Sequence, residues 1–123
     1  MDIGEGVRIS RRARLDKTNP AGIHIGDHTM ITGGVAILTH DFVNRAWSEV
    51  HIGKHCFIGY NTVVMPGVTI GDGCIIGANS VVTRDIPAYS VAVGVPAKVL
   101  QTDIRTGPYG IRLDKGNDQP IAI

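Results

Sequence analysis

The five histidines are the residues whose chemistry at neutral pH could matter most in this chain. His24 and His28 flank Ile25 in the same way that His51 and His55 flank Ile52, and the fifth histidine, His40, precedes an aspartate. Imidazole has an unperturbed pKa near 6.5, so it can transfer protons or bind metal ions under cellular conditions. Which of these roles applies depends on how the chain positions each ring.

The positioning element is a six-residue repeat. From Ile52 onward an aliphatic residue returns at every sixth position. Four of these aliphatic residues are followed directly by Gly, and four positions after each comes a small or β-branched residue, such as Cys56, Thr62 or Ser80. The same frame recurs upstream in two shorter runs. The aliphatic positions are Ile3, Ile9, Leu15, Ile25, Ile31, Ile37, Ile52, Ile58, Val64, Ile70, Ile76 and Val82.

This spacing predicts short strands joined by tight turns. Residues two apart in a strand share one face, so the aliphatic residue and the small residue before it both point inward. The glycine after the aliphatic residue is expected to turn the corner through unusual dihedral angles. Six-residue units of this kind wind into coils that stack at about 4.8 Å, and several coils must stack to bury an apolar face.

Composition agrees with a solenoid and excludes other classes. The chain has 123 residues, only 5% aromatic, with 16 glycines and a net charge of +1, so neither a nucleic-acid partner nor an anionic membrane is indicated. It contains no run of about 18 apolar residues and opens with no signal peptide. Cys56 and Cys74 occupy equivalent small-residue positions, which predicts buried, reduced thiols in a soluble, cytoplasmic protein.

Two interruptions break the repeat. Ten positions separate Leu15 from Ile25, which leaves four extra residues around 17–20, and fifteen separate Ile37 from Ile52, which leaves nine. If the three-face count resumes after each break, Ile25 and Ile52 lie on the same face of adjacent coils, and the flanking histidines stack in two pairs. The longer insertion must then leave the solenoid as an external loop that contains Trp47, the only tryptophan.

With these features the sequence resembles the hexapeptide-repeat acyltransferases, most closely the maltose, galactoside and xenobiotic acetyltransferase group. The resemblance covers roughly residues 3–100 and is most specific over 52–99. It implies an all-β fold, a left-handed parallel β-helix of about four to five triangular coils. Residues 1–100 would form this domain, with the external loop at about 40–50, and residues 101–123 a C-terminal tail without the repeat.

His40 matches the histidine that acts as general base in that family, just before the extended loop. An alcohol or amine acceptor must lose a proton as it attacks a thioester, and a partly neutral imidazole suits that transfer, a contribution of about 10²–10⁴-fold. Asp41 could orient the ring, although it also fits the small-residue position four after Ile37.

The C-terminal repeats resemble the coenzyme A segment of the family, over 77–87 and 93–99. The resemblance implies that Ala78 presents its backbone to the pantetheine arm and that Thr83 and Arg84 lie near the coenzyme. Lys98 falls where the family has a basic residue near the nucleotide phosphates, which Arg and Lys attract. The implied coenzyme-binding residues also include Phe57, which stands where several relatives have Trp, and Tyr60, which stands where they often have Ser.

The resemblance further implies a homotrimer whose active sites lie between subunits, and open coil ends also favour association. The function that we expect is transfer of acetyl from acetyl-CoA to a hydroxyl or amine of a small molecule, such as a sugar or antibiotic. One alternative is a non-catalytic binding or structural solenoid. A metal enzyme of the carbonic anhydrase type is disfavoured because no third ligand joins the paired histidines, so no metal is expected.

Overall fold

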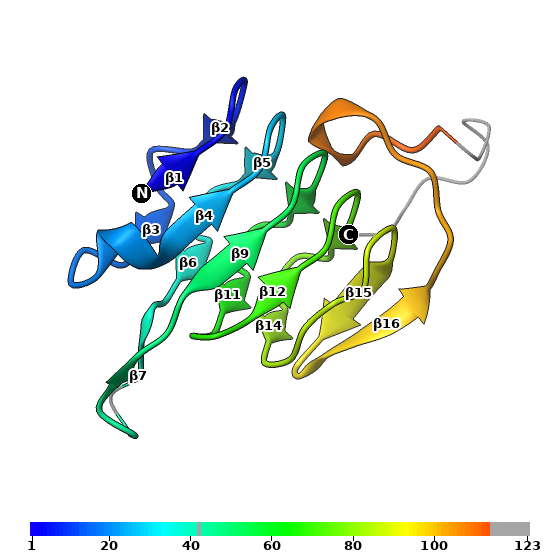
Figure 1. Cartoon of the computed structure of the whole chain (residues 1–123). Coiled ribbons are helices and arrows are strands. Elements are labelled where there is room, and N and C mark those ends of the chain that lie inside the picture. The colour runs from blue at the N-terminus through cyan, green and yellow to red at the C-terminus, as the bar shows by residue number, and fades with distance from the viewer. Residues whose placement is uncertain (42, 114–123) are drawn as a thin grey trace.

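The computed structural model describes residues 1–41 and 43–113 as a triangular solenoid with three parallel sheets (Figure 1). The first sheet, sheet A, contains β1 (Asp2–Ile3), β4 (Ile23–Ile25), β9 (Val50–Ile52) and β12 (Thr69–Ile70). Sheet B contains β2 (Arg8–Ile9), β5 (Met30–Ile31), β10 (Phe57–Ile58), β13 (Ile75–Ile76), β15 (Val91–Gly94) and the antiparallel β16 (Ala97–Gln101). Sheet C contains β3 (Arg14–Leu15), β6 (Ala36–Ile37), β11 (Val63–Val64) and β14 (Val81–Val82).

Each coil takes one strand from each sheet, and the predicted register is confirmed. Ile25 pairs with Ile52 across the longer insertion, and Ile37 pairs with Val64. The chain therefore forms four complete coils, and a fifth begins with the bridge between Ile70 and Ile86. The left-handed parallel β-helix that the family resemblance implied is the fold of this chain.

The core consists of the aliphatic positions of the repeat, stacked in rows inside the triangle. Ile31, Ile37, Ile58 and Val64 are fully buried, and each such side chain contributes about 1.5–3 kcal/mol of burial free energy. The small residues of the repeat also point into the triangle, and several of them make hydrogen bonds. Cys56 and Cys74 are buried and free, as predicted.

The small buried residues fasten each coil to the next. The hydroxyl of Thr29 donates to the carbonyl of Gly53 (2.7 Å), and that of Thr62 donates to the carbonyl of Gly77 (3.0 Å). The thiol of Cys56 donates to Gly71 in the same geometry (3.2 Å). In each case the acceptor follows the stacked aliphatic residue of the next coil. These bonds satisfy corner carbonyls that strand pairing leaves unmatched.

The role predicted for the glycines that follow the aliphatic residues is wrong. The positive φ angles lie two residues further on, at positions such as His55 (58°) and Asn61 (60°). A Cβ on Gly59 would lie 2.7 Å from the backbone nitrogen of Ala78, and one on Gly53 would lie 2.6 Å from that of Asp72. These glycines are needed because successive coils approach closely at the corners, not because the backbone takes an unusual conformation there.

The insertion between Ile37 and Ile52 is a hairpin that projects from the solenoid (Figure 1). Its strands are β7 (His40–Asp41) and β8 (Ala46–Trp47), which pair in antiparallel fashion. The shorter insertion contains the 3₁₀ turn η1 (Pro20–Gly22). The external loop predicted from the repeat count is therefore present, and it begins at His40.

The described part of the C-terminal tail folds back over its own solenoid. Ile104 packs with Phe57, Ile75 and Val91 on the outer face of sheet B. Further along, η2 (Pro108–Gly110) brings Tyr109 to the first coils, where its hydroxyl donates to the Gly6 carbonyl (2.7 Å). Residues 114–123 lie outside the described part.

The described residues include no helix with the length and hydropathy of a membrane-spanning segment.

Candidate functional site

His40 lies at the point where the chain leaves sheet C and enters the hairpin. Its backbone pairs with Trp47 across β7 and β8, and the two rings stack with centroids 4.1 Å apart and planes 21° apart. His40 is half-buried, whereas Trp47 is 56% exposed. The hairpin therefore holds the imidazole against an indole at the edge of the solenoid, where solvent and small molecules can reach it.

Asp16 anchors the backbone beneath His40. Its carboxylate accepts the backbone N–H of Thr39 (3.0 Å), and the hydroxyl and N–H of Thr18 donate to its other oxygen. Burial alone would raise the pKa of Asp16, but the hydrogen bonds from Thr18 and from the backbone of Thr39 and His40 outweigh it, so the pKa lies below its ordinary value. The ionised carboxylate thus fixes the first residues of the hairpin.

The shorter insertion supports the longer one. The hydroxyl of Thr39 donates to the carbonyl of Asn19 (2.9 Å), immediately before η1. The four extra residues near Asn19 therefore underlie the base of the hairpin. The sequence pattern identified neither Asp16 nor Asn19. Both residues lie outside the aliphatic and small-residue positions of the repeat, and both are far from His40 in the sequence.

The carboxylate of Asp41 makes hydrogen bonds within the hairpin turn. Its carboxylate accepts the backbone N–H groups of Val43 (2.9 Å) and Asn44 (3.1 Å) and the side-chain amide of Asn44. These hydrogen bonds, led by the one from the Asn44 side chain, lower the pKa of Asp41. Asp41 therefore closes the hairpin turn.

Two of the predicted coenzyme residues share one corner of the triangle. Tyr60 and Ala78 follow β10 and β13, between sheets B and C, and the N–H of Asn79 donates to the Tyr60 carbonyl (2.7 Å). Tyr60 is 58% exposed and Ala78 is half-buried. A groove of about 1090 Å³ continues from Tyr60 and Asn61 toward the first coil, where Arg11, Arg12 and Arg14 line it.

The other predicted coenzyme residues lie elsewhere. Thr83 and Arg84 are exposed and follow β14, at the opposite end of sheet C from Ala78. Lys98 is exposed on β16, opposite Val93 in the last hairpin. Phe57 packs beneath the C-terminal segment, with its Cβ 2.6 Å from where a Cβ on Gly110 would lie. A coenzyme contact of Phe57 stays a prediction. The packing of the Phe57 side chain against the C-terminal segment gives this residue a structural role.

Within one chain, His40 is not brought to the Tyr60–Ala78 corner. His40 leaves the C-terminal end of β6, the same end of sheet C as Thr83, with one coil between them. Because successive coils of a β-solenoid stack at about 4.8 Å, His40 and Thr83 are offset by about 10 Å along the solenoid axis. Between the two corners sheet C presents a row of half-buried, small apolar side chains, formed by Ala36, Val63 and Val81.

Comparison with known proteins agrees with this architecture. The family described as Bacterial transferase hexapeptide (six repeats) matches residues 49–84. The chain is 40% identical over 114 residues to Protein CapG of Staphylococcus aureus, covering 79% of this chain and 66% of CapG. A maltose O-acetyltransferase from Clostridium difficile 630 superposes with a TM-score of 0.67 at 32% identity, covering 82% of this chain and 68% of the enzyme.

A third relative was crystallised with acetyl coenzyme A. This hexapeptide-repeat acetyltransferase from Vibrio cholerae, solved as a complex with acetyl coenzyme A, superposes with a TM-score of 0.73 at 31% identity, covering 81% of this chain and 58% of that one. The chain therefore belongs to the hexapeptide-repeat acyltransferases, which fold as left-handed parallel β-helices. It spans about two thirds or less of the length of CapG and of this neighbour.

Proposed function

We propose that the chain transfers an acetyl group from acetyl-CoA to a hydroxyl, or an amine, of a small molecule such as a sugar or an antibiotic. The observation that carries the proposal is His40, whose ring is stacked on Trp47 at the base of the only hairpin that interrupts the described coils. Membership of an acyltransferase family supports the reaction type, and the complex of the Vibrio cholerae relative supports the donor.

The proposed chemistry is direct transfer with His40 as general base. The imidazole removes the proton of the acceptor hydroxyl as its oxygen attacks the thioester carbonyl, forming a tetrahedral intermediate. Collapse of that intermediate breaks the carbon–sulfur bond, and the imidazolium returns its proton to the departing thiolate. The products are the acetyl ester and free coenzyme A. Proton transfer of this kind contributes about 10²–10⁴-fold.

The coenzyme is proposed to run along the corners of the solenoid. Ala78 would present its backbone to the pantetheine arm, and Tyr60 and Thr83 would lie beside the coenzyme. The exposed side chains of Arg84 and Lys98 supply positive charge toward the coil end at which phosphates would bind. Of the predicted set, Phe57 has the weakest support as a coenzyme contact because residues 104–110 pack over it.

The proposed assembly is a homotrimer with sites between subunits, and the same geometry supports it. His40 and the Tyr60–Ala78 corner lie at opposite ends of sheet C, so a neighbouring chain is needed to bring a base to that corner. The apolar row on sheet C formed by Ala36, Val63 and Val81 gives such a neighbour a flat surface. A cytoplasmic location, predicted from the two reduced thiols, is part of this proposal.

The test is release of free thiol from acetyl-CoA against a panel of sugars, amino sugars, aminoglycosides and chloramphenicol-type acceptors. We expect thiol release that depends on both acceptor and protein, with an equal amount of acetylated acceptor by mass spectrometry. The alternative of a non-catalytic solenoid predicts coenzyme binding without turnover. If coenzyme A neither bound nor raised the melting temperature, the proposed function would be wrong.

A further inference from the structure

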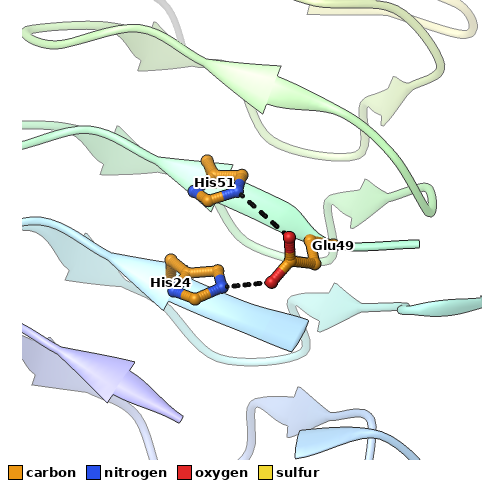
Figure 2. Close-up of side chains that lie close together, drawn as sticks. All are labelled: His24, Glu49 and His51. Carbon is orange, nitrogen blue, oxygen red and sulfur yellow. Dashed lines mark hydrogen bonds and ion pairs between the residues drawn. The ribbon is translucent and has the colours of Figure 1, made fainter. Parts of the chain in front are cut away.

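Three metal-type ligands converge on the outer face of sheet A (Figure 2). The pairing of β4 with β9 places His24 against His51, and their rings stack with centroids 4.3 Å apart and planes 6° apart. Glu49 precedes β9, and its carboxylate oxygens lie 2.9 Å from His24 Nε2 and 4.0 Å from His51 Nε2. This is the third partner that the paired histidines lacked in the sequence.

We propose that His24, Glu49 and His51 bind a divalent transition-metal ion of the zinc type. Two imidazoles and one carboxylate form a ligand set suited to zinc, and such three-ligand sites leave a fourth position for water. Each residue offers one ligand atom, and these atoms lie within 4.8 Å of one another. None of the three ligands is among the residues proposed for acyl transfer, so the proposal does not depend on acetyl transfer.

Asp2 lies in the position of a carboxylate that orients His24 as a metal ligand. Its carboxylate lies 3.3 Å from Nδ1 of His24, on the side of the ring opposite to the nitrogen that faces Glu49. Histidines that bind metal usually donate their other ring N–H to a carboxylate, which fixes the tautomer and ring orientation. Asp2 therefore directs the lone pair of His24 Nε2 toward the proposed metal.

The three ligand atoms can be brought to one metal ion by rotation of the side chains, without movement of the backbone. Zinc–nitrogen bonds are about 2.0–2.1 Å, so the ligand atoms must move together from their present separations. The side chains of Glu49 and His51 are 62% and 51% exposed and have room to rotate, whereas the backbone of both histidines is held by strand pairing. The fixed register thus keeps the two imidazoles adjacent, and the mobile carboxylate completes the set.

A metal here would tie the hairpin to the solenoid. Glu49 lies two residues after β8, where the hairpin that begins at His40 returns to the coils, and His24 belongs to the preceding coil. The open coordination position would face a groove of about 500 Å³ along sheet A, lined further up by Thr69 and Asp72. The metal would therefore join two coils at the point where the insertion re-enters the repeat.

The same two coils contain a natural control. His28 and His55 also lie next to each other, but their rings meet edge to face, with centroids 6.1 Å apart and planes inclined by 61°. Among the described residues, only His24, Glu49 and His51 form a group of three or more such ligands with convergent atoms. His55 has a φ of 58°, a conformation that Asn tolerates, so His55→Asn removes a histidine with little strain.

The experiment is calorimetric titration of Zn²⁺ into untagged protein from which metal has been stripped with EDTA. We expect saturable binding of one ion per chain in the wild type and in His55→Asn. Asp2→Asn should weaken the affinity by about 10–100-fold, and His51→Gln or Glu49→Gln by more than Asp2→Asn. Circular dichroism and the melting temperature of each metal-free variant establish that the coils are intact.

Substitution with Co²⁺ gives a second, spectroscopic readout. We expect intense visible absorption bands of a four-coordinate ion in the wild type and in His55→Asn, and their loss in His51→Gln. Three results would overturn the proposal: no saturable binding by the wild type, equal affinity in the wild type and His51→Gln, or an equal loss in His55→Asn.

Discussion

His40 and Trp47 face each other across the β7–β8 hairpin with ring centroids 4.1 Å apart. Strand pairing sets the two Cα positions opposite one another, and stacking then limits how the imidazole can rotate. A base that must meet an acceptor proton needs such restraint, because small errors of position reduce proton-transfer rates strongly. The hairpin therefore restrains the ring of the candidate base.

Replacing Trp47 with Ala should release the His40 ring. The stacked pair is worth about 0.5–1.5 kcal/mol, so we expect kcat/KM for acetyl transfer to fall by about 2- to 10-fold. Trp47→Phe keeps an aromatic partner and should retain most of the rate, and the affinity for coenzyme A should be the same in all three proteins. An equal loss in Trp47→Ala and Trp47→Phe would show that stacking is not what positions the ring.

Asp16→Asn should loosen the base of the hairpin in a pH-dependent way. An amide accepts through one oxygen only, so a hydrogen bond from either Thr39 or Thr18 is lost, at a cost of about 1–2 kcal/mol near neutral pH. The pKa of Asp16 is lowered in the folded state, so its contribution is complete above the ordinary value of 3.8 and disappears as the pH falls through the folded-state pKa.

Denaturant unfolding of the wild type and Asp16→Asn across this range measures the difference directly. The two free energies of unfolding should differ most near neutral pH and converge in acid below pH 3.8. A difference that stayed constant with pH would mean that the carboxylate charge contributes nothing.

Two glycine substitutions separate close approach from backbone conformation. In Gly59→Ala the new Cβ would lie 2.7 Å from the nitrogen of Ala78 and from the carbonyl oxygen of Ile76, so we expect a loss of about 1–3 kcal/mol in unfolding free energy. In Gly33→Ala the nearest atom is 3.5 Å away, and the stability should be unchanged or higher by up to about 1 kcal/mol. Similar losses in both variants, measured by denaturant unfolding, would contradict the close-packing explanation.

Mixing two inactive variants tests whether sites lie between subunits. His40→Ala removes the proposed base, and Ala78→Tyr blocks the proposed coenzyme corner. After joint refolding in equal amounts, a trimer that combines groups from adjacent chains should recover about a quarter of the wild-type activity, because a random arrangement yields that share of intact sites. If each chain holds a complete site, the mixture will stay as inactive as its parts, provided that sedimentation shows trimers in every sample.

The repeat predicted the register of the coils but not the contacts between their edges. Counting sixes across the insertion predicted that His24 stacks on His51, and the rings do stack. Glu49 and Asp16 could not be found in this way, because their importance depends on side chains that reach a neighbouring coil. The corner glycines were assigned the wrong cause for the same reason: their neighbours, Asp72 and Ala78, are 19 residues away in the chain.

The tail shows a further limit of sequence patterns. Residues 102–113 lack the repeat, so periodicity could not predict their path or their contacts. In the structure Tyr109 donates its backbone N–H to the carbonyl of His28 (2.7 Å), and Arg8 lies over its ring at 4.4 Å. Contacts of this kind join residues about 80–100 positions apart, and they arise from the shape of the finished solenoid.

The most direct test of the account is the rate of thiol release from acetyl-CoA by the wild type and by His40→Ala. It is measured at saturating donor with an acceptor that the wild type acetylates. We predict a rate about 10²–10⁴-fold lower in His40→Ala, with the affinity for coenzyme A and the melting temperature nearly unchanged. Full turnover by His40→Ala would contradict the assignment of His40 as the base.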